Sequence, residues 1–252
     1  MIVPDANILQ PLIDVANAVL KFFHDNVGLS WGMSIIALTV CTRALLIPLT
    51  YKQIKGMRAM QALQPQIKEL QEKYKNDKQR MQQEMMRFYK ENKVNPFASC
   101  IPLIAQLPVF ITLFYTLRHE LPPDMGCEAG HCAAYGAEFL FIKDLTASAH
   151  GAELIALLIL YVGTQLASGF FMSVTADKSQ RTMMFILPLI FVPFVIKFPA
   201  GLILYWITTN LWTIGQGITV NKIIPAPKVA TPEEKRAAKP PPKSPKKKRK
   251  RR

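Results

Sequence analysis

The sequence predicts an all-α, polytopic membrane protein with five transmembrane helices, a cytoplasmic helical hairpin and an N-terminal amphipathic helix. Two observations predict this class. Half of the 252 residues are apolar, and they are gathered in long blocks instead of being spread evenly. The segments between these blocks alternate between basic and acidic, which is typical of a chain that crosses a membrane repeatedly.

The apolar blocks set the number of spans. A helix needs about 20 apolar residues to cross a hydrocarbon core of ~30 Å. Five blocks meet or approach this length, at residues 29–51, 97–117, 153–174, 183–198 and 199–220. The fourth is short and requires local bilayer thinning or shelter by its neighbours. Buried helices of a soluble protein are the alternative, and five blocks in one chain make it the weaker one.

The charges predict the orientation. Residues 52–96 carry eleven Lys and Arg against five Asp and Glu, and the tail from residue 221 carries thirteen against two. Residues 118–152 are acidic, with two basic residues against five acidic ones. Because basic loops stay on the cytoplasmic side, we expect 52–96, the short 175–182 loop and the 221–252 tail inside the cell. The N-terminus and the 118–152 loop are then outside.

Residues 1–28 are predicted to form an external amphipathic helix at the membrane interface. We expect no cleavable signal peptide, because a basic start and a continuous apolar run are missing. Packing on the outer ends of the spans is a compatible alternative. The helix is predicted because apolar residues recur at helical spacing and do not form a continuous run: Leu9, Leu12, Ile13, Ala16, Val19, Leu20 and Phe23.

Residues 52–96 are predicted to fold as two antiparallel helices, with a break at Lys75, Asn76 and Asp77. Both helices are basic and amphipathic. Methionine is flexible and polarisable, so the methionines could contact varied hydrophobic partners, or could simply hold the hairpin together. They are Met57, Met60, Met81, Met85 and Met86.

The tail at 221–252 is rich in proline and charge and is predicted to be disordered. Its basic residues suit anionic lipids or ribosomal RNA, and a merely solvated tail is the alternative.

In the external loop, Cys127 and Cys132 form either a disulfide or two free thiols. With His131 alone beside them, the ligands are too few for a zinc site.

Arg43 is the unusual residue of the spans. An arginine at the centre of a membrane helix costs ~2.5 to 3.5 kcal/mol on insertion scales, and the spans contain no carboxylate except Glu153 at an edge. Arg43 either extends to the cytoplasmic interface or faces a wet cavity. Polar residues on its own face and in other spans could line that cavity: Thr39, Thr50, Gln106, Thr112, Gln165, Ser168, Thr208, Thr209 and Asn210.

The same inventory argues against an enzyme. The spans contain no histidine and lack the paired carboxylates, nucleophile–base pairs and glycine-rich phosphate loops that catalysis would need. A proton-coupled transporter would also require an intramembrane carboxylate or histidine. We therefore expect no catalytic residues, no metal and no cofactor.

Several motifs, in order, resemble the YidC-type membrane protein insertases, in a short form without the large extracytoplasmic domain. The motifs are LTVCTRALLIPLTYKQ, LQPQIKELQEKYKND, EMMRFYKENKVNPF, CIPLIAQLPVF and GLILYWITTNLWTIGQ. The resemblance implies five helices around a hydrophilic groove that is closed to the outside and open to cytoplasm and lipid. It also implies a hairpin for early substrate contact and a basic tail that engages ribosomes.

By this resemblance Arg43 matches the groove arginine, Gln165 and Trp206 match further groove positions, and Gln106 is a weaker match. The resemblance implies that the chain inserts nascent membrane proteins into the bacterial plasma membrane. Expected partners are nascent membrane proteins, the ribosome through tail and hairpin, and anionic lipids, with the general secretory channel as a further candidate. A small-anion channel or carrier is the alternative function, and a binding-only scaffold is a third.

Overall fold

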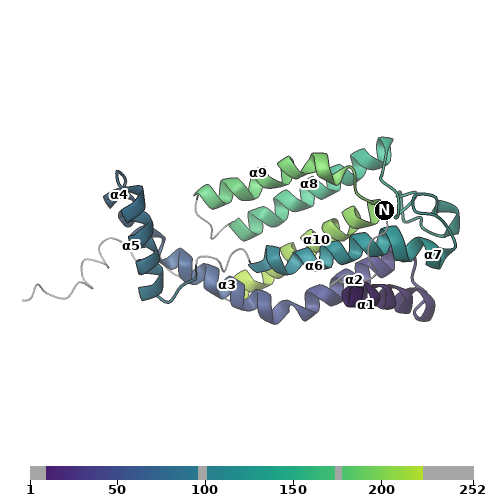
Figure 1. The fold of residues 1–252 in the computed structure, drawn as a ribbon, viewed down its shortest axis with the longest axis horizontal. Coiled ribbons are helices and arrows are strands. Elements are labelled where there is room, and N and C mark those ends of the chain that lie inside the picture. The colour runs from purple at the N-terminus through teal and green to yellow at the C-terminus, as the bar shows by residue number, and fades with distance from the viewer. Residues whose placement is uncertain (1–9, 96–100, 174–177, 224–252) are drawn as a thin grey trace, which may run out of the picture.

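The computed structural model describes residues 10–95, 101–173 and 178–223, and the part it describes is helical. Helices α2, α6, α8, α9 and α10 run alongside one another as a bundle (Figure 1). The hairpin of α4 and α5 lies at one end of this bundle, and α1 and α7 lie near the opposite end. The all-α class predicted from the sequence is confirmed.

Helix α1 (Gln10–Lys21) has the predicted amphipathic character. Its buried face consists of Ile13, Ala16 and Leu20, whereas Leu12 and Val15 are exposed. A π-helical turn, η1 (Phe22–Asn26), and Gly28 at φ +76° lead to the next helix. Lys21 forms an ion pair of 2.7 Å with Asp124, and this pair ties α1 to α7.

The first predicted span is bent. Helix α2 (Trp31–Leu45) and helix α3 (Ile47–Ala62) meet at Leu46 with an angle of 55°. Pro48 explains the break, because proline has no N–H for the carbonyl four residues earlier and its ring collides with that carbonyl. The predicted boundary between span and hairpin, at residues 51 and 52, therefore falls inside α3.

A helical hairpin is observed as α4 (Gln64–Lys73) and α5 (Lys78–Glu91), whereas residues 52–62 of the predicted hairpin belong to α3 and are separated from α4 at Leu63. The two helices are joined at residues 74–77, where the sequence predicted a break. Asp77 begins α5 as its N-cap, and its carboxylate accepts a hydrogen bond of 2.9 Å from the Arg80 N–H.

Helix α10 (Ala200–Ile223) is central in the bundle and packs on α8 (Gly151–Ser173) and α2. Its Leu202 and Ile203 are fully buried. Helices α6 (Ile101–Tyr115) and α9 (Lys178–Val195) complete the bundle. On α8, Ile155 and Ile159 are 61% and 67% exposed, as expected for side chains that face lipid.

Among the described residues, α8 is the one helix that is long and apolar enough to cross a membrane by itself, over Gly151–Phe171, and α2 with α3 could do so as one bent span. The count of five spans stays a prediction, as do the exact domain boundaries. Of the predicted 175–182 loop, residues 175–177 lie outside the described residues and residues 178–182 belong to α9. The 221–252 tail lies largely outside the described residues, as does Cys100.

A segment that we name the disulfide lobe, residues 121–150, covers one end of the bundle. It begins with α7 (Leu121–Met125) directly after the π-helical turn η3 (Thr116–Glu120), and includes the short 3-10 helix η4 (Ala133–Tyr135). Cys127 and Cys132 are joined by a disulfide, with Cα atoms 5.3 Å apart. The alternative that the sequence left open is thus decided in favour of the disulfide.

Candidate functional site

Arg43 lies in the last turn of α2, just before the bend, and is partly exposed. No described carboxylate comes within ion-pair distance of its guanidinium. The ion pairs of Lys21 with Asp124 and of Arg87 with Glu91 lie elsewhere. An arginine beside an apolar bundle without an acidic partner must reach water or a polar cavity to remain charged.

The structure provides such a cavity, which we name the Arg43 cavity. Its volume is about 90 Å³, and it is formed where α2, α3, α6 and α10 approach one another. Its apolar lining consists of Leu46, Leu49, Ile54 and Ala105. Its polar lining consists of Arg43, Thr50, Gln53, Gln106, Thr213 and Gln216.

Two of the four predicted site residues, Arg43 and Gln106, therefore meet in one cavity. Gln106 also donates a hydrogen bond from its side-chain amide to the Tyr205 hydroxyl. Tyr205 is 2% exposed and lies close enough to Arg43 for an electrostatic interaction. The phenol of Tyr205 thus lies beside both Gln106 and Arg43.

Trp206 and Gln165 are not among the described residues that line the Arg43 cavity. Trp206 stacks on Phe110 with ring centres 5.2 Å apart, and its ring also lies near those of Tyr161 and Phe198. Gln165 is partly exposed on α8. A substrate-contact role for these two residues stays a prediction.

Most hydroxyls that the sequence suggested as cavity lining are engaged with their own helices. Thr39 donates to the Ile35 carbonyl at 2.7 Å, and Thr208 donates to the Leu204 carbonyl at 2.9 Å. Ser168 donates to the Gln165 carbonyl at 2.9 Å. Such bonds satisfy a hydroxyl inside an apolar bundle, and none of these three residues is among those that line the Arg43 cavity.

Three polar cavity residues were missed at the sequence level: Gln53, Thr213 and Gln216. The sequence of α10 contains a spacing that indicates two of them, Thr213 and Gln216. Tyr205, Thr209, Thr213 and Gln216 follow one another at intervals of four, four and three, which places them on one helical face. Gln53 lies beyond the predicted end of the first span and was assigned to the hairpin.

At the end of the bundle nearest the disulfide lobe, the backbone of the lobe is hydrogen-bonded directly to the start of α10. The N–H groups of Ala200 and Gly201 donate to the carbonyls of Ala147 and Leu145, at 2.7 and 2.9 Å. A Cβ atom on Gly201 would lie 2.9 Å from the Leu145 oxygen, so only glycine allows this close approach. Leu145 itself is fully buried. The lobe thus packs into the bundle end.

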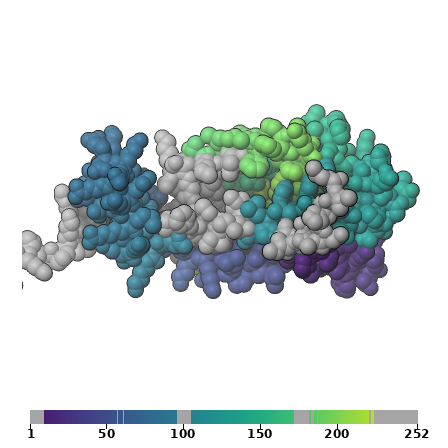
Figure 2. Space-filling model, viewed as in Figure 1, coloured from purple at the N-terminus to yellow at the C-terminus, as the bar shows by residue number. Residues whose placement is uncertain are grey.

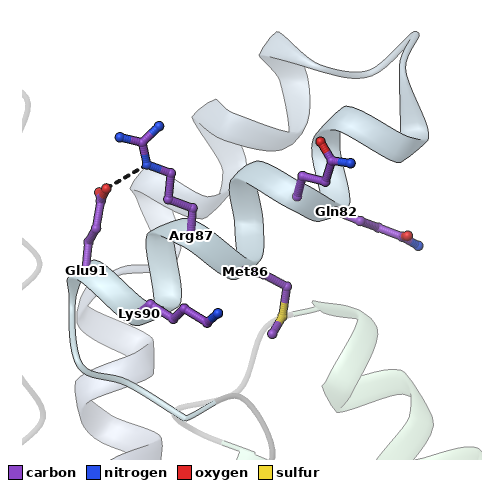
Figure 3. Close-up of a pocket in the computed structure, with 6 residues that line it drawn as sticks. Gln82, Met86, Arg87, Lys90 and Glu91 are labelled. Atoms are coloured by element: carbon purple, nitrogen blue, oxygen red, sulfur yellow. Dashed lines mark hydrogen bonds and ion pairs between the residues drawn. The ribbon is translucent and has the colours of Figure 1, made fainter.

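At the opposite end, α5 carries a shallow hollow of about 520 Å³. Figure 3 shows Met86 beside Gln82 and Lys90, with Arg87 paired to Glu91 at 2.8 Å on the same helix. The hydrogen bond and charge of Glu91 raise the pKa of the Arg87 guanidinium, which stays positive. Met86 is 46% exposed, so an apolar side chain lies open among cationic and amide groups.

Fold and site together define a class: a helical membrane protein with a basic hairpin at one end, whose bundle holds an arginine that has no acidic partner among the described residues and lines a polar cavity. The family model described as "60Kd inner membrane protein" matches residues 22–227. The chain belongs to this family, which makes it a bacterial membrane protein.

Similar proteins of known name lead to the same family. A protein of Streptomyces avermitilis named "Membrane protein insertase YidC" is 36% identical over 236 residues, covering 82% of this chain and 55% of the relative. A Haemophilus ducreyi protein of the same name is 38% identical over 198 residues, covering 79% of this chain and 34% of the relative. The chain thus spans between a third and about half of the length of these relatives.

A solved structure is also similar. The chain matches "Active YidC insertase crystal structure with the first transmembrane domain resolved" with a TM-score of 0.65 at 25% sequence identity. The match covers 84% of this chain and 46% of that chain. The helical arrangement described above is therefore shared with a known membrane insertase.

Proposed function

We propose that this chain is a membrane protein insertase and chaperone, which inserts nascent membrane proteins into the bilayer through a hydrophilic groove built around Arg43. The observation that carries the proposal is that Arg43 has no acidic partner in the described part of the chain and shares its cavity with five other polar side chains. A charge that the described residues leave without an acidic partner is available to an acidic group from outside. The names of the relatives support the same function.

The mechanism begins at the hairpin, where Met86 and the surrounding basic residues of α5 contact the emerging client. An acidic N-terminal segment of the client then enters the Arg43 cavity and is held by the guanidinium, which shortens the polar distance to be crossed. Transfer of the client's apolar helix into lipid supplies the driving force, at ~0.8 kcal/mol per buried CH₂. No nucleotide hydrolysis is required.

The charge pattern supports a plasma-membrane orientation with the N-terminus outside and the C-terminus in the cytoplasm. In this orientation the hairpin and the basic tail face the ribosome and anionic lipids, and the disulfide lobe is external. A disulfide is stable in an oxidising exterior, which agrees with that side. The general secretory channel is a further candidate partner.

Site-specific photocrosslinking tests the proposal. A photoreactive residue at position 106 or 213 is placed in membranes that hold ribosome-stalled chains of a single-span client with an acidic N-terminus. We expect crosslinks from both positions and from position 86 on the hairpin. Crosslinks from position 86 with none from 106 and 213 would contradict insertion through the Arg43 cavity. Anion flux through proteoliposomes without any client would instead favour the channel alternative.

A further inference from the structure

One tight turn of the disulfide lobe exposes apolar side chains at its tip. The N–H and carbonyl groups of Phe139 and Ile142 bond to each other reciprocally, at 2.9 and 2.8 Å. The two residues between them, Leu140 and Phe141, are 85% and 44% exposed. Leu140 has the highest exposed fraction of the large hydrophobic side chains in the described residues.

The backbone of the turn makes this choice of residue unusual. Leu140 has φ +54°, in the left-handed region, which suits glycine or asparagine and is uncommon for a bulky side chain. Folding of the turn alone would therefore favour glycine at position 140. A leucine that is both strained and exposed gains nothing from packing within the chain, so its side chain is better explained by an external partner.

The base of the turn is firmly held. Phe139 packs so closely on α2 that a Cβ atom on Gly32 would lie 2.2 Å from its ring, and Ile142 is 2% exposed. The next buried residue, Asp144, accepts hydrogen bonds from the Cys132 and Thr146 N–H groups at 2.7 and 2.8 Å. The Cys127–Cys132 disulfide closes the same lobe. The apolar tip is thus presented by a rigid base.

The location indicates which partner the tip meets. Gly32 is the second residue of α2, where the first predicted span enters the membrane, and the neighbouring Met33 is 41% exposed. The turn therefore continues the lipid-facing surface of the bundle at its end. Lys143, exposed directly after the turn, suits the phosphate groups found at that depth. Figure 2 shows the lobe, in teal, at the end of the bundle away from the hairpin.

We propose that the Leu140–Phe141 tip inserts into the lipid bilayer, at the boundary between headgroups and acyl chains of the leaflet nearest the disulfide lobe. The lobe is thereby anchored beside α2 and held over the bundle end. The proposal goes beyond insertase activity and needs only the membrane location of the bundle. Its partner is lipid, not a second copy of the chain or a client.

Lipid crosslinking tests it in the full chain. The photoreactive residue p-benzoylphenylalanine replaces Leu140 in proteoliposomes of phosphatidylethanolamine and phosphatidylglycerol, and intact-protein mass spectrometry follows irradiation. Position 159 on α8 is the lipid-facing control and exposed position 134 in the same lobe is the aqueous control. We expect lipid adducts at position 140 at a level near that of 159 and at least fivefold above that of 134.

A second variant separates loss of the apolar tip from loss of folding. Leu140→Asn tolerates the left-handed backbone, so the lobe keeps its disulfide, but lipid adducts from the photoreactive residue at position 141 should fall severalfold. Lipid adducts at 159 with none at 140 would overturn the anchor and leave the insertase proposal intact. A covalent dimer, or an adduct within the chain, from position 140 would show a protein partner and also overturn it.

Discussion

Arg43 is the residue on which the proposed function depends. Within the described residues it has no acidic partner, and it shares its cavity with amides and hydroxyls that can solvate a guanidinium but cannot neutralise it. A charge held within an apolar bundle without an acidic partner weakens folding. Such a residue is better explained by binding than by stability, and this distinction can be measured.

We expect Arg43→Ala to reduce insertion of a client with an acidic N-terminus by roughly 5- to 30-fold, which corresponds to the loss of about 1 to 2 kcal/mol of attraction. Protease protection of the client in proteoliposomes measures this. Arg43→Lys keeps the charge and should retain most of the activity. The thermal stability of Arg43→Ala should not fall, because no ion pair is broken. Equal insertion by Arg43→Ala and the parent chain would contradict the proposed role.

Asp144, in contrast to Arg43, is a charged residue that stabilises the fold. Its carboxylate, 7% exposed, accepts from the Cys132 N–H and from both the N–H and the hydroxyl of Thr146. Asp144→Ala leaves these three donors without their acceptor and should lower the free energy of unfolding by roughly 3 kcal/mol.

Thermal unfolding in lipid nanodiscs measures the change in Asp144→Ala. Asp144→Asn keeps one acceptor oxygen and should lose less. Glu138→Ala removes an exposed carboxylate from the same lobe and should be neutral. If Asp144→Ala were as stable as Glu138→Ala, the hydrogen-bond network would not hold the lobe together.

At the scale of elements, periodicity was enough to predict helices and where the hairpin turns, since Asp77 supplies a cap at the predicted break. It was not enough to predict the bend at Leu46. Pro48 was visible in the sequence, but an apolar run with a proline can be read as a kinked span or as two helices. The bend determines which residues line the cavity, because it directs α3 so that Thr50 and Gln53 reach the cavity.

The cavity itself was predictable only in part. Arg43 is conspicuous as a charge in an apolar run, and Gln106 as an amide in another. Whether two polar residues on different helices meet depends on helix rotation and tilt, which are set by close contacts such as Gly201 on Leu145. The hydroxyls of Thr39 and Thr208 could not be assigned from sequence, because a hydroxyl can satisfy its own helix carbonyl as easily as line a cavity.

The N-cap of α5 gives a prediction for the hairpin. Asp77→Ala removes the acceptor for the Arg80 N–H and should cost about 1 kcal/mol of local helix stability. Hydrogen exchange of the first turn of α5 should accelerate about fivefold, with little change in α10. Asp77→Asn retains a capping oxygen and is the matched control. Unchanged exchange in Asp77→Ala would show that contacts between α4 and α5 alone fix the helix start.

For the whole molecule, the two ends of the bundle differ physically. At one end, backbone carbonyls of the disulfide lobe bond to the start of α10, and the surrounding Leu117, Leu121 and Leu145 are fully buried. The basic hairpin lies at the other end (Figure 1), and the Arg43 cavity lies where the bend between α2 and α3 meets α6 and α10. This difference supports the proposal that a polar segment enters from the hairpin side and not from the lobe side.

This asymmetry leads to a prediction about access to the bundle interior. Cysteines are introduced at Gln216, in the cavity, and at Leu202, which is fully buried near the lobe, after Cys41 and Cys100 are replaced by serine. A membrane-impermeant, charged thiol reagent should modify Gln216→Cys at least tenfold faster than Leu202→Cys, because the proposed groove joins only the first site to water. Mass spectrometry of the reacted chain measures both rates.

Adding the thiol reagent to one face of the membrane at a time also tests the orientation. In inverted vesicles, whose cytoplasmic face is outward, Gln216→Cys should react, and in intact spheroplasts it should not. Reaction from both sides would indicate a continuous pore, which would favour the channel alternative. Reaction only in spheroplasts would reverse the orientation proposed from the charge pattern. Because the disulfide lobe and the hairpin lie at opposite ends of one bundle, one pair of cysteines tests both the orientation and the closed end.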